Sequence, residues 1–114
     1  MGRILVVGSL AYDTVETPTG RAQRTLGGSA NYFSLGASLY APVSVVGVVG
    51  EDYSADDIKL LSSRGVNVDG IQRAKGKTFH WEGSYVRDLN EAETIATDLN
   101  VFGEFNPVIP ESYR

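Results

Sequence analysis

Two features of the sequence have residue types and a spacing that suit ligand binding. The first is the segment Gly27-Gly28-Ser29-Ala30-Asn31, which precedes a predicted helix. Consecutive glycines let a ligand approach the backbone closely and leave N–H groups free at the helix start, where the helix dipole favours oxyanions or hydroxyl oxygens. Asn31 would add a side-chain donor and acceptor. The alternative is a plain loop with a tight turn, because glycine pairs are common in turns.

The second feature is Asp13, which lies shortly after a predicted strand at residues 3–8. Ligands of open α/β sheets bind outside the carboxyl ends of the strands. A carboxylate at that place could accept hydrogen bonds from two adjacent hydroxyls of a sugar. The alternative is a solvated loop aspartate, since most aspartates are exposed.

The hydrophobic pattern predicts the elements that position these residues. We expect buried strands at 3–8 and 43–49, and a largely buried helix that begins after the glycine pair and ends before Pro42. A second helix at about 55–64 and a short strand at 66–71 follow. The order β-loop-α-β-α-β is typical of a parallel α/β sheet with crossover helices.

After this region the pattern changes to strict alternation, in which Phe79, Trp81 and Tyr85 share one face. A second alternating run at 94–102, with Asn90 in the turn, predicts an antiparallel hairpin. Such an aromatic face usually packs in a core or an interface. It could also stack on a sugar ring or bury against the same hairpin of a second subunit.

Composition excludes several other classes of protein. The chain has 114 residues, 42% of them apolar and 21% charged, which suits one globular domain without a membrane-spanning helix. It has no cysteine, and His80 is its only histidine, so we expect no metal site. The net charge of −4 gives no reason to expect nucleic acid or an anionic membrane as a partner. Since no export signal is present, we expect a cytoplasmic protein.

Taken together, these motifs resemble the N-terminal part of the PfkB (ribokinase-like) family of carbohydrate kinases. The family's asparagine usually stands one residue further from the glycine pair than Asn31 does. The matching stretches are residues 3–8 with Asp13, residues 26–31, residues 43–49 with Gly50-Glu51-Asp52, and the hairpin at 78–102, where the family has a small β lid.

The resemblance implies a ribokinase-like, Rossmann-type parallel sheet, present in part, with an antiparallel β lid. On this basis we expect a partial α/β substrate-binding domain at 1–76, which includes a short hairpin at about 13–25. The lid hairpin would occupy 77–104, and an exit segment would occupy 105–114.

The resemblance also implies a function, namely that of the substrate-binding part of a kinase that transfers the γ-phosphate of ATP to a carbohydrate or nucleoside hydroxyl. The alternative is a non-catalytic interaction module that dimerises through its aromatic β face. The residues expected to bind the substrate are Asp13, Gly27, Gly28, Asn31, Phe79 and Trp81.

Other parts of the kinase are expected outside this chain. The family's catalytic aspartate stands in a Gly-Ala-Gly-Asp motif, which this sequence lacks. We therefore expect no catalytic residue here, and ATP and Mg²⁺ would serve the full-length enzyme without binding tightly to this segment. The family's lid frequently mediates dimerisation, so a homodimer through the lid is also expected.

Overall fold

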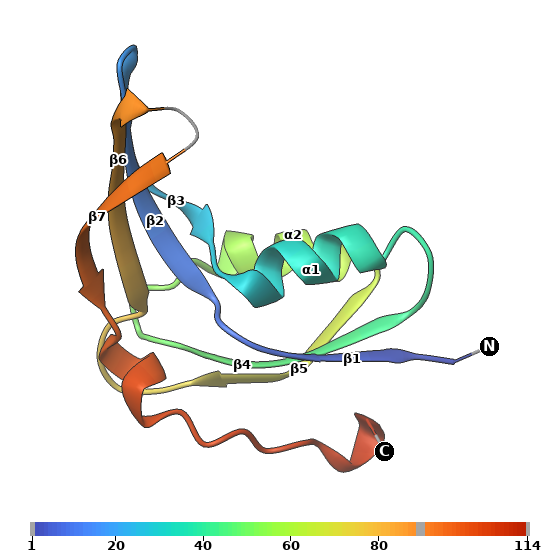
Figure 1. Ribbon diagram of the computed structural model, residues 1–114. Coiled ribbons are helices and arrows are strands. Elements are labelled where there is room, and N and C mark those ends of the chain that lie inside the picture. The colour runs from blue at the N-terminus through green and yellow to red at the C-terminus, as the bar shows by residue number, and fades with distance from the viewer. Residues whose placement is uncertain (1, 89–90, 114) are drawn as a thin grey trace.

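The structure, a computed structural model, describes residues 2–88 and 91–113 (Figure 1). Asn90, the predicted turn residue, lies outside them. Two sheets and two helices make up the fold, and two short 3₁₀ helices lie near the C-terminus. The strands are β1 (Ile4–Val7), β2 (Ala11–Thr17), β3 (Gly20–Gly27), β4 (Val43–Val49), β5 (Val66–Arg73), β6 (Phe79–Asp88) and β7 (Glu91–Asp98). The helices are α1 (Ser29–Ala37), α2 (Ala55–Ser63), η1 (Asn100–Glu104) and η2 (Glu111–Tyr113).

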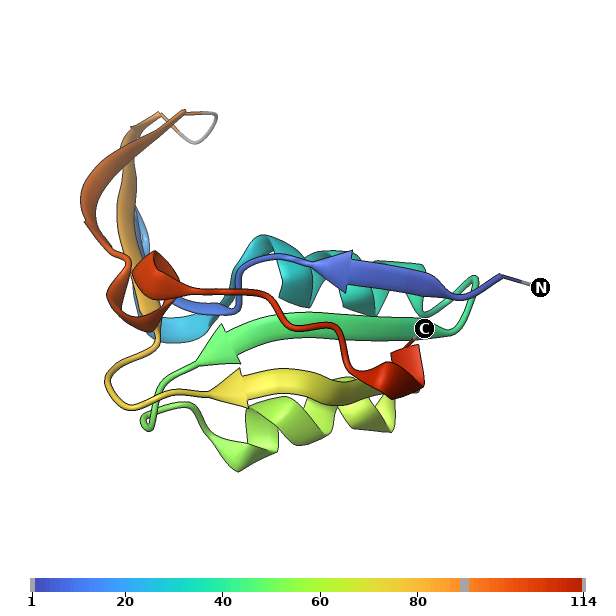
Figure 2. The ribbon, with the colours of Figure 1, turned by 90° about the horizontal axis from the view of Figure 1, so that it is seen from below.

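A three-stranded parallel sheet in the order β1-β4-β5 forms the body of the molecule together with α1 and α2. Both crossovers run in the same direction along the sheet, so both helices lie on one face, as Figure 1 shows. The C-terminal segment runs across the opposite face (Figure 2). Every residue of β4 is buried, which explains why the strand is apolar apart from Ser44 and confirms the strand predicted at 43–49.

A four-stranded sheet in the order β3-β2-β6-β7 projects from the body. The hairpin predicted at about 13–25 is present and longer, and it joins the aromatic hairpin because β2 pairs with β6 in parallel. This joining has a physical reason, since an isolated two-stranded hairpin is marginally stable in water and a wider sheet is not. We call these four strands the projecting sheet.

The second alternating run does not extend to residue 102 as predicted. The last strand ends at Asp98, and Asn100 takes a left-handed backbone conformation with a φ of 51° that no strand can accommodate. Its side-chain amide donates to the carbonyl of Thr78 (2.9 Å), and the chain continues as the η1 helix. The left-handed turn at Asn100 and its bond to Thr78 thus end the strand before the alternating pattern does.

The two helices differ in how far they follow the predictions. The helix predicted at about 55–64 is present as α2: Ser54 caps its first turn by accepting a hydrogen bond from the N–H of Asp56 (3.1 Å), and Gly65 follows it with a φ of 81°. The expectation that α1 would be largely buried is wrong. Only one side of α1 packs on the body, and Tyr32 and Phe33 are exposed.

The hydroxyl of Tyr113 fills a break in the β4–β5 ladder. The pairing register shifts beside Val45, and the Gly70 N–H donates to the Tyr113 hydroxyl (2.8 Å), which itself lies 3.1 Å from the Val45 carbonyl oxygen. We predict that Tyr113→Phe lowers the free energy of unfolding by about 1–3 kcal/mol, because it leaves partly buried backbone groups unpaired. Urea unfolding followed by circular dichroism measures the loss. The exposed Tyr40→Phe is the control, and equal midpoints for the two variants would contradict the prediction.

No helix in the described part of the chain has both the length and the apolar character needed to cross a membrane.

Candidate functional site

Asp13 and the glycine pair, far apart in the sequence, lie against each other in the structure. On the projecting sheet, Ala11 of β2 pairs with Gly27 of β3, and Asp13 points from the same face of β2. A methyl group added to Gly27 would overlap the Asp13 carboxyl group. The absence of a side chain at Gly27 therefore makes room for this carboxylate, so the two candidate features lie together.

Gly28 turns the chain from β3 into α1. Its φ of 90° is a conformation that residues with a side chain rarely adopt, and a Cβ there would overlap the carbonyl group of Ser9. The same Ser9 carbonyl accepts the N–H of Ala30 (2.9 Å), and the Ser9 hydroxyl accepts the N–H of Ser29 (3.0 Å). These two helix N–H groups are therefore not free for a ligand, contrary to the sequence-based expectation.

Asn31 lies behind the glycine bend and is only 2% exposed. Its side-chain amide donates to the Gly27 carbonyl (2.6 Å) and to the hydroxyl of Tyr53 (3.2 Å). Within the described residues its amide oxygen has no hydrogen-bond partner. In this structure Asn31 braces the bend from the interior, whereas the sequence suggested direct contact with a ligand.

The two aromatic candidates share a face with Asp13. Asp13 is the register partner of Trp81 on β6, and Ala11 is the register partner of Phe79. The indole of Trp81 lies across Gly83, since a Cβ at that glycine would overlap the ring. The Phe79 ring stacks on Phe102 at a centroid distance of 5.3 Å. The structure thus places a carboxylate and an indole side by side on the sheet face that carries the glycine bend.

The Asp13 carboxylate is partly buried, and none of the described residues forms a hydrogen bond or an ion pair with it. Burial raises the pKa of this carboxyl group, and the positive charge of His80 opposes the rise. A carboxylate that has lost water without gaining a protein partner is well suited to accept hydrogen bonds from a ligand.

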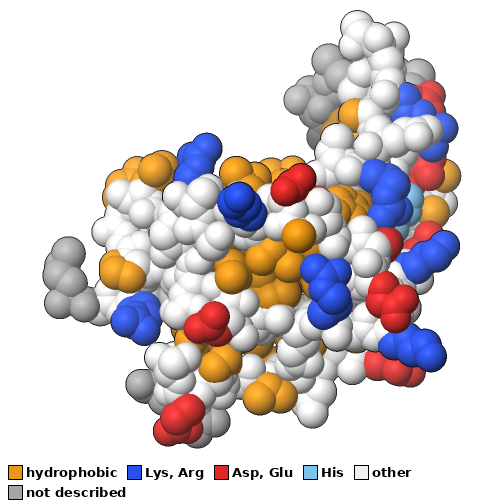
Figure 3. Space-filling model, turned by 180° about the vertical axis from the view of Figure 1, so that it is seen from behind, with side chains coloured by type: hydrophobic (Ala, Val, Ile, Leu, Met, Phe, Trp, Pro, Cys, Tyr) orange, Lys and Arg blue, Asp and Glu red, His pale blue; other side chains and the backbone are white. Residues whose placement is uncertain are grey.

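The opposite face of the projecting sheet is occupied by charged and polar pairs. Arg21 and Glu82 form an ion pair (3.0 Å), and the His80 imidazole lies 2.7 Å from the hydroxyl of Thr14. Figure 3 shows the histidine of this face among basic and acidic side chains. Because these groups already have partners within the chain, this face is less suited to a ligand than the face of Asp13.

Tyr12, next to Asp13 in β2, joins the projecting sheet to the body. Its hydroxyl donates to the carboxylate of Asp57 (2.6 Å) and accepts the N–H of Ser54 (2.9 Å). Burial and the hydrogen bond to Asp57 raise the pKa of Tyr12 to about 12, so the phenol stays protonated. Its ring packs on Tyr53 at 5.1 Å, which links it to the residue that contacts Asn31.

Asp52 provides a second connection between the two parts. Its carboxylate accepts the N–H of Thr78 (2.8 Å) and a guanidinium N–H of Arg24 (2.8 Å). Burial alone would raise the pKa of Asp52, but the hydrogen bonds from Thr78 and Arg24 outweigh it and lower the pKa. The ionised form therefore stabilises the fold above the ordinary pKa of about 3.8, and this contribution is lost as the pH falls through the lowered value.

Three residues that hold the site in place were not predicted from the sequence, namely Tyr12, Tyr53 and Arg24. Tyr12 carried a usable signal, because it alternates with Asp13 in a strand and must therefore point to the opposite face. Tyr53 and Arg24 carried none, since their contacts depend on how the projecting sheet sits on the body.

The described residues suit a hydroxyl-bearing ligand better than a metal ion. In the ranges 2–88 and 91–113, no three carboxylate or imidazole groups converge on a point where a metal could bind. What the site offers is one carboxylate acceptor and an aromatic neighbour beside a glycine bend whose Gly27 is itself buried.

Comparison with known proteins gives one relative in sequence and many in structure. No family model matches the chain. A cytidine kinase of Thermococcus kodakarensis is 33% identical over 112 residues, which cover 96% of this chain and 39% of the kinase. The chain thus spans about 39% of the length of the curated relative that it matches.

Three solved structures illustrate the likeness in fold. Ribokinase from Cryptococcus neoformans var. grubii in complex with ADP has a TM-score of 0.73 at 23% identity, over 88% of this chain and 35% of its own. A putative ribokinase II from E. coli in complex with ATP and Mg²⁺ has a TM-score of 0.71 at 16% identity. The match covers 91% of this chain and 36% of the ribokinase chain. A nucleoside kinase from Burkholderia thailandensis in complex with inosine has a TM-score of 0.70 at 18% identity. The match covers 90% of this chain and 37% of the nucleoside kinase chain.

These matches agree with the motifs around Asp13 and the glycine pair. The chain has the ribokinase-like fold, and in sequence and structure it resembles part of the kinases of the PfkB (ribokinase-like) family.

Proposed function

We propose that this chain is the substrate-binding part of a PfkB-type kinase that transfers the γ-phosphate of ATP to a hydroxyl of a nucleoside or a related sugar. The observation that carries the proposal is the position of Asp13, whose partly buried carboxylate lies against Gly27 without a partner among the described residues. A ribose has two adjacent hydroxyls that one carboxylate can bind together.

A nucleoside fits this face better than a free sugar does. Trp81 is the register neighbour of Asp13, and an indole offers a flat surface on which a base can stack. The relatives that point the same way are a cytidine kinase and a nucleoside kinase in complex with inosine. We therefore take cytidine as the first ligand to test.

Phosphoryl transfer also needs a base for the acceptor hydroxyl and groups that stabilise the phosphate charge. Among the described residues, the helix N–H groups of Ser29 and Ala30 are already bonded within the chain. We infer that ATP and Mg²⁺ bind to other parts of the kinase. This chain supplies the binding and orientation of the acceptor.

Titration of cytidine, 2′-deoxycytidine and ribose tests the proposal. Trp81 is the sole tryptophan of the chain and the register neighbour of Asp13, so its fluorescence reports on this face. We expect cytidine to bind, and the deoxynucleoside, which keeps only one of the two adjacent hydroxyls, to bind about tenfold more weakly. Calorimetry provides an independent affinity. Equal affinities of the two nucleosides, or no binding of cytidine at all, would refute the proposed use of the hydroxyl pair.

The alternative function, dimerisation through the aromatic β face, is less favoured by the packing. Phe79 stacks on Phe102, and Phe102 stacks on Phe105 at 5.9 Å, so part of that face is covered within the chain. A homodimer through the lid hairpin remains a prediction. Chromatography of the chain and its Trp81→Ser variant tests it, because loss of an interfacial indole would shift a dimer to a monomer.

A further inference from the structure

Gly83 lies on the same face of the projecting sheet as Asp13 and Trp81, two residues beyond Trp81 on β6. It is buried because the far end of the Trp81 indole lies over it. A Cβ at Gly83 would have atoms of the six-membered ring of this indole as its three nearest neighbours. Two residues of a strand span roughly 6.6 Å, so the indole must extend along β6 to reach this position. The indole therefore lies along the sheet instead of standing out from it.

The two side chains proposed to bind the ligand each lean over a glycine, and they lean in opposite directions. The parallel strands β2 and β6 both run from the body toward the outer end of the sheet (Figure 1). Gly27, which makes room for the Asp13 carboxylate, pairs with Ala11 and so lies on the body side of Asp13. Gly83 lies on the outer side of Trp81. The carboxylate thus points toward the body, and the indole points toward the outer end of the sheet.

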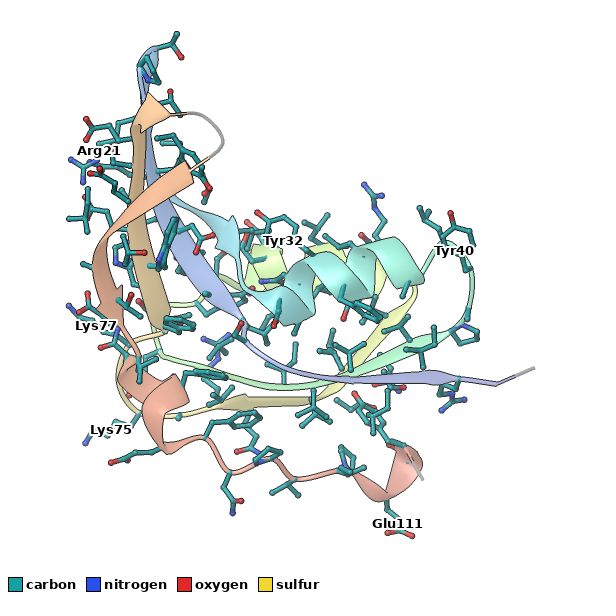
Figure 4. The ribbon with its side chains drawn as sticks, viewed as in Figure 1. Arg21, Tyr32, Tyr40, Lys75, Lys77 and Glu111 are labelled. Atoms are coloured by element: carbon teal, nitrogen blue, oxygen red, sulfur yellow. The ribbon has the colours of Figure 1, made fainter. Side chains whose placement is uncertain are left out.

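The register neighbours of Gly83 are uncharged. They are Val15 on β2 and Thr94 on β7. Glu82, which precedes Gly83, faces the other side of the sheet and forms its ion pair there with Arg21, whose side chain extends to the left of the sheet in Figure 4. The ion pair of this part of the sheet thus lies on the opposite face. The face with the indole offers the apolar contact that a stacked base needs.

We propose that Gly83 is a positioning residue that gives the candidate site its preference for a nucleoside over a free sugar. Its lack of a side chain lets the Trp81 indole lie along the sheet, where a base can stack on it while the ribose hydroxyls reach Asp13. The ribose then lies on the body side, and the base lies toward the outer end of the sheet. This inference rests on the proposed function, because it concerns the same ligand and the same face.

Gly83→Ala should move the indole and leave the fold intact. Gly83 has an ordinary strand conformation, and the atoms that a Cβ would overlap belong to the free end of a side chain, which can swing away. Alanine also suits the interior of a strand at least as well as glycine does. Phe79, two residues before Trp81, occupies the same face on the body side. The displaced indole must therefore stand out from the sheet.

Acrylamide quenching of the Trp81 fluorescence measures this displacement in the free chain. Quenching should be stronger in Gly83→Ala than in the wild type, because the raised indole is more accessible. Gly20→Ala is the matched control in the same sheet, since a Cβ there meets no heavy atom within 4 Å. Equal quenching in all three proteins would show that the indole does not depend on Gly83 and would overturn the proposal.

Calorimetric titration of cytidine and ribose tests the effect on the ligand. Gly83→Ala should weaken cytidine binding about tenfold, because stacking of the base is lost, and should change ribose binding less than about twofold. Gly20→Ala should bind both ligands as the wild type does. Unchanged affinity of Gly83→Ala for cytidine would contradict the proposal. An equal loss for cytidine and ribose would contradict it too, because it would reflect a general disturbance of the site.

A double-mutant cycle separates an effect through the indole from any other effect of the new methyl group. Trp81→Leu removes the ring, so adding Gly83→Ala to that variant should not weaken cytidine binding further. A second tenfold loss would show that Gly83 acts independently of Trp81 and would refute its positioning role. A wild-type chain that does not bind cytidine would instead refute the proposed function, so the two failures are distinguishable.

Discussion

Asp13→Asn is expected to weaken cytidine binding by roughly 10–100-fold. Hydrogen bonds that involve a charged group contribute about 1.5–3 kcal/mol, and each 1.4 kcal/mol corresponds to a tenfold change in affinity. The amide keeps the shape of the side chain beside Gly27 but replaces one acceptor oxygen with a donor and removes the negative charge. Titration followed by Trp81 fluorescence, with calorimetry as a second method, measures the loss.

The same substitution should leave the fold at least as stable at pH 7. The pKa of Asp13 is raised in the folded state, so the folded chain binds this proton more tightly than the unfolded chain. Ionised Asp13 therefore destabilises the fold. This cost is absent below the unfolded pKa of about 3.8, appears as the pH rises through the folded value, and is fully present above it. The gain from Asp13→Asn should thus be larger at pH 7 than at pH 3.

Opposite effects on binding and stability separate a ligand-binding role from a structural one. Asp69→Asn is the matched control, since it removes the same charge from an exposed position on β5. It should change neither property appreciably. If Asp13→Asn lost stability at pH 7 and kept its affinity for cytidine, the carboxylate would be a structural group, and our assignment would be wrong.

Gly28→Ala should have the largest effect on stability, a loss of about 2–6 kcal/mol in the free energy of unfolding. The backbone conformation of Gly28 (φ 90°, ψ 146°) is essentially restricted to glycine and costs a residue with a Cβ about 1–3 kcal/mol. Overlap of the new methyl group with the Ser9 carbonyl adds a cost of about 1–3 kcal/mol, as overpacking does elsewhere. Urea unfolding followed by circular dichroism measures the sum.

Gly20→Ala is the control for the loss of glycine itself. It lies at the start of β3, where a Cβ would meet no heavy atom within 4 Å, so its effect should be small. Equal stability of Gly28→Ala and Gly20→Ala would mean that the bend relaxes to accept a side chain. In that case the backbone conformation of Gly28 would not be a rigid part of the candidate site.

The sequence predicts the elements of the body well because local signals determine them. The apolar run of β4 matches the strand observed, and α2 begins after Ser54 and ends before Gly65. The proximity of Asp13 and Gly27 was also predictable, since the hairpin expected at about 13–25 brings the start of β2 beside the end of β3.

What could not be predicted depends on contacts between distant segments. The parallel pairing of β2 with β6 joins residues more than 60 positions apart, and nothing in either strand specifies it. Ser9 uses the helix N–H groups that the glycine pair was expected to leave free. The position of Asn31 follows from a partner, Tyr53, that belongs to another segment.

The alternation of β2 has a mechanical consequence. Tyr12 and Asp13 are neighbours in one strand and point in opposite directions, the phenol toward α2 and the carboxylate toward the candidate ligand. Any rotation of the projecting sheet that advances the carboxylate must stretch the bonds from the phenol to Asp57 and Ser54. The two hydrogen bonds of the Tyr12 hydroxyl thus oppose any movement of Asp13 that a bound ligand would favour.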